Sequence, residues 1–316
     1  MTVGPTLLGI DTRPRFRHNP TTGGNVAKTS KHHLQLLADG LDFGEGPRWH
    51  DGRLWYSDFH QHCVYAVAPD GTRETMVEVG SEQPSGLGWL PDGDLLVVAM
   101  TARQVWRIHK GIQTVHADLS HIATWHCNDM VVAANGIAYV GNFGFDLEGG
   151  AEPKTTSLAI VQPDGTVETG PDGLAFPNGS VITPDGKTLI VGETFAGRLT
   201  AFDVSENGSL SNRRIWVETP NVMPDGCCLD EAGGIWVANA LGHEVVRYEE
   251  NGAVTDRIAM PTLGGPQTAF ACMLGGTDRR TLHCLTAPGA DTNSTAGQGA
   301  GAIWTVRVNY AGTGLP

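Results

Sequence analysis

Six positions of this chain carry side-chain oxygens at a nearly constant distance before a turn glycine. Five of them lie eight residues before the glycine, and the sixth lies seven residues before it. They are Glu45, Ser85, Asn128, Asn178, Asp225 and Gln267. Carboxylates and amides form the hard oxygen set that Ca²⁺, Mg²⁺ or Mn²⁺ prefers. The pattern predicts a site for one divalent ion, with two carboxylates to neutralise its charge, if the fold brings these positions together.

The same residue types also have an ordinary explanation, since Asp, Asn and Gly are common in turns. Pro-Asp-Gly occurs at five further places, several of them between two expected strands. Pro224-Asp225-Gly226 differs, because it precedes the first strand of its repeat and occupies the slot of Pro177-Asn178-Gly179. Asp129 directly follows Asn128, so strand alternation predicts that its side chain points away from the metal.

The elements that must position these residues recur along the chain. Each repeat has a polar residue beside Pro or Gly, an apolar run, a turn with Gly, and a second run of β-branched and aromatic residues. The repeats begin at Glu45, Gln83, Cys127, Phe176, Met223 and Gly265. Their starts are roughly 40 to 50 residues apart, which is the length of a four-stranded propeller blade. Short strands and regular turns, without an amphipathic helix, favour the same fold.

We therefore expect an all-β fold, a six-bladed β-propeller with four-stranded antiparallel blades around a central channel. Residues 32–40 precede the first repeat and can supply the outer strand of the last blade, which protects strands that would otherwise form open edges. We expect residues 1–30 to be an extended arm and residues 31–316 to be a single propeller domain. Residues 288–301 lack β-branched and aromatic side chains beyond one or two threonines, which predicts a flexible loop in blade six.

Short motifs at four of the six positions resemble one family. They are Glu45-Gly46-Pro47, Asn128-Asp129, Pro177-Asn178-Gly179 and Pro224-Asp225-Gly226. The chain resembles the senescence marker protein / gluconolactonase / luciferin-regenerating enzyme family of calcium-dependent propellers from about residue 33 to its end. The resemblance implies that the metal ligands are Glu45, Asn128, Asn178 and Asp225. It implies Ca²⁺ as the ion, with Mg²⁺, Mn²⁺ or Zn²⁺ as alternatives.

One position departs from that family. Sugar-lactonase members place an Arg two residues before the Asn-Asp asparagine, where this chain has His126. His126 is a candidate substrate contact or proton carrier, and otherwise a rim residue. With Phe143 nearby, it argues against a sugar-acid lactone that bears a free carboxylate. Further candidates for substrate binding are Ser85, Glu193 and Gln267.

The composition excludes several classes of partner. The 316 residues carry a net charge of −13, which disfavours nucleic acid and anionic lipid. No window is long and apolar enough for a membrane span, and the N-terminus has no signal-peptide pattern. The six cysteines show no paired spacing and are expected to be reduced, so we expect a cytoplasmic protein acting on a small molecule. The sequence does not indicate an oligomeric state.

The predicted activity is metal-dependent hydrolysis of a lactone or related ester. The resemblance implies that Asp225 is the general base as well as a ligand, and His126 is the second catalytic candidate. Two alternatives stay open. The same site could serve other metal-assisted carbonyl chemistry, such as aldol-type cleavage or dehydration, or the propeller could be a non-catalytic binding module with a structural metal.

Overall fold

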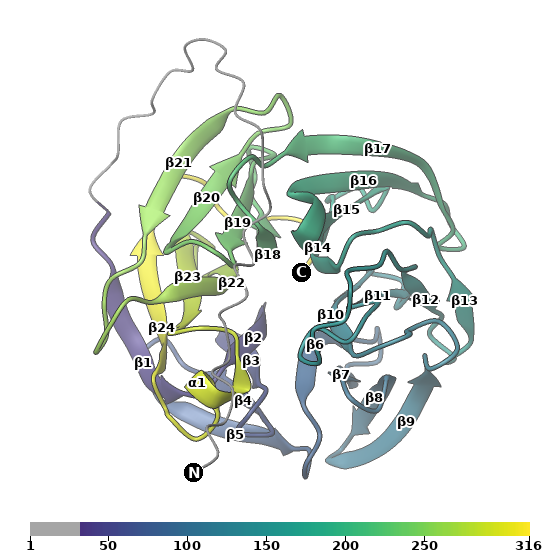
Figure 1. Cartoon of the computed structure of the whole chain (residues 1–316), viewed down its shortest axis with the longest axis horizontal. Coiled ribbons are helices and arrows are strands. Elements are labelled where there is room, and N and C mark those ends of the chain that lie inside the picture. The colour runs from purple at the N-terminus through teal and green to yellow at the C-terminus, as the bar shows by residue number, and fades with distance from the viewer. Residues whose placement is uncertain (1–31) are drawn as a thin grey trace, which may run out of the picture.

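The computed structural model describes residues 32–316, and the expected arm of residues 1–30 lies outside them. Six four-stranded antiparallel sheets are arranged in a ring around a central axis (Figure 1). The predicted six-bladed β-propeller is confirmed.

The first three blades each contain four consecutive strands, which run in chain order from the innermost to the outermost. Blade 1 contains β2 (Gly44–His50), β3 (Arg53–Asp58), β4 (Cys63–Val67) and β5 (Arg73–Glu78). Blade 2 contains β6 (Pro84–Trp89), β7 (Leu95–Ala99), β8 (Gln104–His109) and β9 (Ile112–Asp118). Blade 3 contains β10 (Cys127–Val132), β11 (Ala138–Asn142), β12 (Ala159–Val161) and β13 (Val167–Thr169).

Blades 4 and 5 follow the same plan, and blade 6 takes its outer strand from the start of the described chain. Blade 4 contains β14 (Pro177–Ile182), β15 (Thr188–Glu193), β16 (Arg198–Val204) and β17 (Leu210–Glu218), with a 3₁₀ helix η1 (Thr194–Ala196) after β15. Blade 5 contains β18 (Pro224–Leu229), β19 (Ile235–Asn239), β20 (Glu244–Tyr248) and β21 (Val254–Ala259). Blade 6 contains β22 (Thr268–Gly275), β23 (Thr281–Ala287), β24 (Gly301–Arg307) and β1 (Gln35–Leu41).

The ring is closed by β1, as the sequence predicts. This strand pairs antiparallel with β24, from Gln35 opposite Thr305 to Leu41 opposite Gly301. Leu41 is completely buried in the core that joins blades 5, 6 and 1. Since the first described strand completes the last blade, β24 has no open edge.

The connection between β23 and β24 is more ordered than predicted. A single-turn helix, α1 (Thr292–Thr295), forms there, and the carboxylate of Asp291 accepts the backbone N–H of Ser294 as its N-cap. The N–H groups of Gly297 and Gly299 donate to the Asp42 carboxylate at 2.7 and 2.8 Å. The sequence did not predict this helical turn, which is stabilised by hydrogen bonds to the Asp291 and Asp42 carboxylates rather than by apolar contacts.

Apolar side chains of adjacent blades pack face to face and form the core between them. One cluster joins Leu96 of blade 2 to Met130 and Val140 of blade 3. Another joins Tyr56 of blade 1 to Trp236 of blade 5 through blade 6. This arrangement leaves the inner strands free to carry polar residues at their ends without interrupting the core.

The C-terminal residues lie against the far ends of two inner strands. Leu315 forms a bridge with Ile182 of β14, and Gly312 forms one with Asp230, which follows β18. The N–H of Thr313 donates to the carbonyl of Leu229. Figure 1 accordingly places the C-terminus close to the centre of the ring.

The six cysteines are all free thiols, as expected from their spacing. Among residues 32–316, no helix has the length and apolar character needed to cross a membrane.

Candidate metal and catalytic centre

The six oxygen-bearing positions all lie at the start of the inner strands. Each of the first five is the second residue of its strand, and Gln267 directly precedes β22; the five are Glu45, Ser85, Asn128, Asn178 and Asp225. We call the end of the propeller axis where these strands begin the mouth. The strand β2 contacts both β10 and β18 across the axis. The positions that were aligned on their turn glycines thus occupy equivalent places in the six inner strands.

Glycines allow the neighbouring inner strands to approach closely beside these positions. A Cβ on Gly46 would lie 2.8 Å from the carbonyl oxygen of Ser85 in the next blade. A Cβ on Gly179 would lie 2.4 Å from the carbonyl oxygen of Asp225. Real Cβ atoms do not tolerate such contacts, so only glycine lets these backbones meet. Each glycine follows a candidate ligand directly, which explains why the motifs read Glu-Gly and Asn-Gly.

Glu45 and Asp225 are buried carboxylates at the mouth, with 6% and 7% of their surface exposed. Burial raises the pKa of Glu45 well above its usual value, and the charges of Asp225 and Asp129 raise it further. Burial, together with Asp129, raises the pKa of Asp225 to about 8. Both shifts indicate negative charge that is poorly compensated within the described chain. A divalent cation between the carboxylates would supply the compensation.

Two amides complete this set, and their orientation suits a cation. Asn128 Nδ2 donates to the carbonyl of Pro177 at 3.4 Å, and Asn178 Nδ2 donates to Thr194 Oγ1 at 3.3 Å. Neither Oδ1 atom accepts a hydrogen bond from another residue in the range 32–316. Both amide oxygens are therefore left as acceptors. Amide orientation is assigned from such hydrogen bonds, and here protein acceptors fix both NH₂ groups.

These four residues fit a divalent ion with hard oxygen preferences. Across residues 32–316, no three His, Cys, Asp or Glu side chains gather to form a metal site by themselves. The candidate centre therefore depends on the two amide oxygens as well as on Glu45 and Asp225.

Asp129 lies where the regular pairing of its strand is interrupted. The pairing of β10 with β11 shifts register between Cys127 and Met130, so the period of two is interrupted at this point. The Asp129 carboxylate accepts a 2.8 Å hydrogen bond from the guanidinium of Arg48, and both residues are buried. Its charge raises the pKa of Glu45 and of Asp225. Asp129 thus contributes to the electrostatics of the centre.

Two of the predicted substrate contacts lie in the ring of inner-strand starts. Ser85 is buried, and its carbonyl oxygen accepts a 2.6 Å hydrogen bond from Ser57 Oγ. Gln267 Nε2 donates to the carbonyls of Leu263 and Ala300 at 3.4 and 3.2 Å. These two acceptors fix the amide orientation, and Gln267 Oε1 is buried without a partner in the described chain. An unpaired buried acceptor is costly, which keeps Gln267 as a candidate partner for a hydrogen-bond donor.

Glu193, a further predicted substrate contact, is held in a network of its own. Its fully buried carboxylate binds the guanidinium groups of Arg198 and Arg213 at 2.9 and 3.2 Å, and it also accepts from Thr200 and from the N–H of Ala175. Burial raises the pKa of Glu193, but these donors outweigh it and leave the pKa lowered. Because protein donors occupy both oxygens, Glu193 acts structurally and holds the start of blade 4 in place.

An aromatic wall borders one side of the mouth. It consists of Trp125, His126, Phe143, Phe145, Phe176 and Phe195, whose neighbouring ring centroids are 4.4 to 6.0 Å apart. The His126 ring stacks on Trp125 at 5.0 Å and 18°. Burial lowers the pKa of His126 despite the acidic residues around it. His126 is therefore a neutral ring with an aromatic neighbour on either side.

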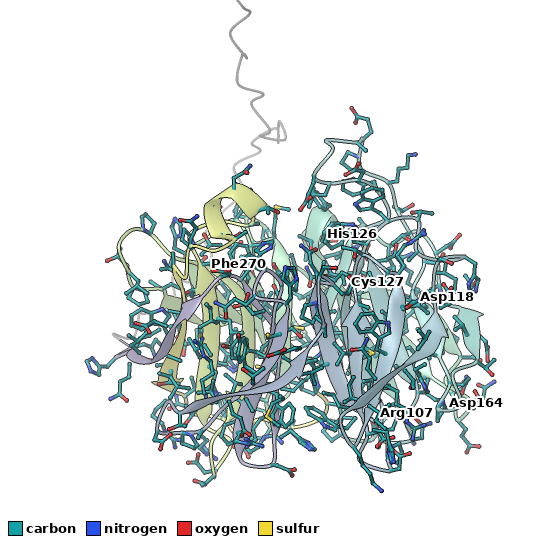
Figure 2. All side chains as sticks on the ribbon, turned by 90° about the horizontal axis from the view of Figure 1, so that it is seen from below. Arg107, Asp118, His126, Cys127, Asp164 and Phe270 are labelled. Carbon is teal, nitrogen blue, oxygen red and sulfur yellow. The ribbon has the colours of Figure 1, made fainter. Side chains whose placement is uncertain are left out.

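Figure 2 places His126 and Phe270 toward the same end of the molecule, with Arg107 and Asp164 at the opposite end. Phe270 packs on Phe43 with ring centroids 4.7 Å apart, and Phe43 packs on Phe59 at 5.1 Å. These three rings come from blades 6 and 1, whereas the aromatic wall comes from blades 3 and 4. Aromatic rings thus lie on two sides of the mouth.

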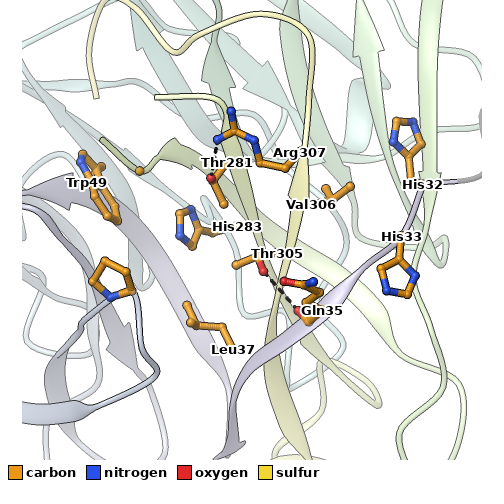
Figure 3. Close-up of a pocket in the computed structure, with 12 residues that line it drawn as sticks. His32, His33, Gln35, Leu37, Trp49, Thr281, His283, Thr305, Val306 and Arg307 are labelled. Atoms are coloured by element: carbon orange, nitrogen blue, oxygen red, sulfur yellow. Dashed lines mark hydrogen bonds between the residues drawn. The ribbon is translucent and has the colours of Figure 1, made fainter. Parts of the chain in front are cut away.

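A pocket of about 510 Å³ lies elsewhere, beside the closing strand (Figure 3). Its lining includes His33, Gln35, Trp49, His283 and Arg307. Trp49 and Arg307 stand near the far ends of β2 and β24, away from the strand starts that define the mouth. None of the predicted site residues lines this pocket, so we do not assign it to the candidate centre.

Two residues that shape the centre were not predicted from the sequence. Arg48 lies three positions after Glu45, where an outward-facing residue of the strand would be expected. Thr194 lies in η1, outside the repeat pattern that identified the ring. The signal for Arg48 was a second charged residue, besides Glu45, within an inner strand. No comparable signal marks Thr194.

A sequence model described as the SMP-30/gluconolactonase/LRE-like region matches residues 43–288. A pentonolactonase of Haloferax volcanii is 32% identical over 86% of this chain and 92% of its own length. Among solved structures, a luciferin-regenerating enzyme superposes with a TM-score of 0.76 at 20% identity, over 90% of this chain and 98% of that one. A regucalcin of Agrobacterium tumefaciens, described as a calcium-binding protein, gives a TM-score of 0.74 at 21% identity, over 90% and 97% of the two chains.

Proposed function

The chain belongs to the SMP-30/gluconolactonase/LRE-like family, and from this premise we propose that it is a hydrolase that opens lactone rings with the help of one divalent metal ion. The single observation that carries the proposal is the ring of strand starts. In it, Glu45 and Asp225 are buried carboxylates, and the amide oxygens of Asn128 and Asn178 accept no hydrogen bond from residues 32–316.

The residues that would hold the ion are Glu45, Asn128, Asn178 and Asp225. Their oxygens suit Ca²⁺ first, with Mg²⁺, Mn²⁺ or Zn²⁺ as alternatives. A bound divalent ion supplies Lewis acidity toward the lactone carbonyl oxygen.

Asp225 is the proposed general base. Its carboxylate accepts a proton from the water that adds to the lactone carbonyl carbon. The ring C–O bond then breaks, and the ring oxygen receives the proton from Asp225. The product is a hydroxy acid, and the base is returned to its starting state.

The remaining candidates would orient the substrate. Gln267 Oε1 is a buried acceptor without a partner in the described chain, and it can bind a substrate hydroxyl. His126 and Phe143 present the aromatic wall, with ring centroids 5.8 Å apart. Ser85 lies in the ring between Glu45 and Asn128.

The proposed substrate is a neutral hydroxylated lactone. The name of the pentonolactonase relative favours a sugar lactone, and the unpaired Gln267 oxygen suits a hydroxyl donor. The argument from the sequence is directed against substrates with a free carboxylate. It rests on His126, which stands where sugar-lactonase members of the family have an arginine. A neutral imidazole lacks the two-pronged pairing that a guanidinium offers a carboxylate.

The test is a panel of lactones, assayed by acid release with the protein free of metal and after addition of CaCl₂. We expect turnover of pentono- or hexonolactones that chelation removes and Ca²⁺ restores. Asp225→Asn should abolish turnover, while Asp164→Asn, an exposed carboxylate at the opposite end of the propeller, should retain it. Calcium binding without turnover of any lactone would instead favour a binding module with a structural metal. Turnover that survives chelation would remove the ion from the proposal.

A further inference from the structure

Arg48 lies in β2 and connects the inner strands of three blades. Its Nε donates to the carbonyl of Leu87 in β6 at 2.9 Å, and its Nη1 donates to the carbonyl of Pro47 at 2.8 Å. Its Nη2 donates to Asp129 Oδ1 at 2.8 Å and also to the carbonyl of Met130 in β10. One guanidinium thus joins blades 1, 2 and 3, three residues along the strand from Glu45.

Both charged groups of the Arg48–Asp129 pair have further hydrogen-bond partners. Arg48 and Asp129 are each only 5% exposed. The Asp129 carboxylate also accepts the N–H of Met130 at 2.8 Å. Burying an ion pair is costly unless hydrogen bonds satisfy both partners, and the planar fork of arginine can reach several acceptors at once. A stable core alone would be served as well by apolar side chains, so the pair calls for a further explanation.

The pair lies beside the candidate metal residues. Asp129 directly follows Asn128 in β10, and Arg48 lies three residues after Glu45 in β2. The strand β2 also contacts β18, which carries Asp225. Three carboxylates and one guanidinium therefore share this buried region, and their ionised forms leave a net charge of −2. That charge matches one divalent cation.

We infer that Arg48 and Asp129 are positioning residues that set the charge against which the candidate cation binds. The inference rests on the proposed metal site. Asp129 adds attraction for the ion without being one of the four proposed ligands. Arg48 holds Asp129 in place and offsets one negative charge, so that the metal-free centre carries −2 rather than −3.

The inference is tested by calcium titration calorimetry at low ionic strength, on protein first stripped with a chelator. Arg48→Met removes the guanidinium and leaves an additional negative charge, so Ca²⁺ should bind about tenfold more tightly. Asp129→Asn leaves Arg48 without its counter-charge, so Ca²⁺ should bind about tenfold more weakly. The double variant restores the net charge and should return the Kd to near the wild-type value.

Two controls separate charge from structure. Arg48→Lys keeps the charge but loses the fork, so its Tm should fall while its Kd stays near the wild-type value. Arg247 forms an equally buried pair with Asp230 beside the far end of β18, with Nε 2.6 Å from the carboxylate. Arg247→Met should therefore lower the Tm and leave the Kd for Ca²⁺ unchanged.

The outcomes are distinct. If Arg48→Met and Asp129→Asn lower the Tm but bind Ca²⁺ as the wild type does, the pair is structural and the inference fails, while the proposed metal site stands. If the wild-type protein binds no divalent ion, the metal site and this inference fail together.

Discussion

Thr194 Oγ1 donates a 2.6 Å hydrogen bond to the carbonyl oxygen of Pro224, the residue directly before Asp225. The same hydroxyl accepts the 3.3 Å hydrogen bond from Asn178 Nδ2. One buried threonine therefore links the proposed ligand of blade 4 to the peptide that carries the proposed ligand of blade 5. The Thr194 hydroxyl thus connects the two proposed ligands, although it is not itself one of them.

Replacing Thr194 by Val should weaken metal binding without unfolding the protein. The variant leaves the Pro224 carbonyl and the Asn178 amide without their shared partner, at a cost of about 1 to 3 kcal/mol. Loss of such an outer contact typically lowers metal affinity by about 10- to 100-fold. Calorimetric titration with CaCl₂ measures the change, and Thr114→Val on the exposed strand β9 is the matched control. Equal Kd values for the two variants would show that Thr194 does not hold the ligands in place.

The contribution of Asp225 to the stability of the metal-free protein should fall as the pH rises from about 4 to about 8. The pKa of Asp225 is raised by burial and by Asp129, to about 8, above its value in an unfolded chain. A carboxyl group whose folded pKa is raised stabilises the fold most when it is protonated, and this contribution disappears as the pH passes through the folded pKa. The pKa of Glu45 is shifted in the same direction, with burial as its main cause.

Thermal denaturation across that pH range, with chelator and with CaCl₂, checks this expectation. The ion should raise the Tm most at pH 8, by about 5 °C or more. Asp225→Asn removes one of the two titrating carboxylates, so the Tm of the chelated wild-type protein should fall relative to that of the variant as the pH rises. A Tm difference between the two proteins that does not change with pH would contradict the shift assigned to Asp225.

Truncation at the start of the chain should separate the closing strand from what precedes it. Removing residues 1–28 leaves β1 intact, so we expect the Tm to stay within a few degrees of the full-length value. Removing residues 1–40 deletes nearly all of β1 and exposes the edge of β24. We expect this variant to lose its cooperative transition or to melt at least about 10 °C lower. If both truncated proteins melt at the same temperature, β1 is not what closes the ring.

His126→Arg should shift substrate preference toward lactones that carry a carboxylate. Burial lowers the pKa of His126, so the wild-type ring is neutral at pH 7 and offers at most one hydrogen bond to an anion. Arginine offers a charged, two-pronged partner, worth about tenfold in the kcat/KM ratio of an acidic to a neutral lactone. The measurement compares that ratio in both proteins, with the Kd for Ca²⁺ expected to change little. Identical ratios would make His126 a bystander at the rim.

The repeat spacing was enough to predict the fold and the ring of strand starts. A turn glycine defines the register of each first hairpin, and equivalent positions of equivalent strands meet at one end of a propeller. For that reason Glu45, Asn128, Asn178 and Asp225 could be grouped from the sequence alone.

The contacts around those positions were not predictable in the same way. The partner of Asp129 could not be predicted from strand alternation, because β10 shifts register against β11 at this point and the carboxylate meets Arg48 of another blade. The partners of Glu193 come from β16, β17 and the segment before β14, and no local pattern marks their convergence. Side-chain hydrogen bonding between distant segments depends on packing detail that a repeat pattern does not contain.

The C-terminal residues that lie against Ile182 and Leu229 affect how a ligand can enter and leave the centre of the propeller. They lie at the end of the axis opposite the mouth, and Arg48 bridges three inner strands. With that end occupied, we expect a ligand to reach Asp225 and to leave again through the mouth. A newly formed hydroxy acid would then occupy the route by which the next lactone enters, so the product should be a competitive inhibitor. Product release, rather than ring opening, can then limit the rate.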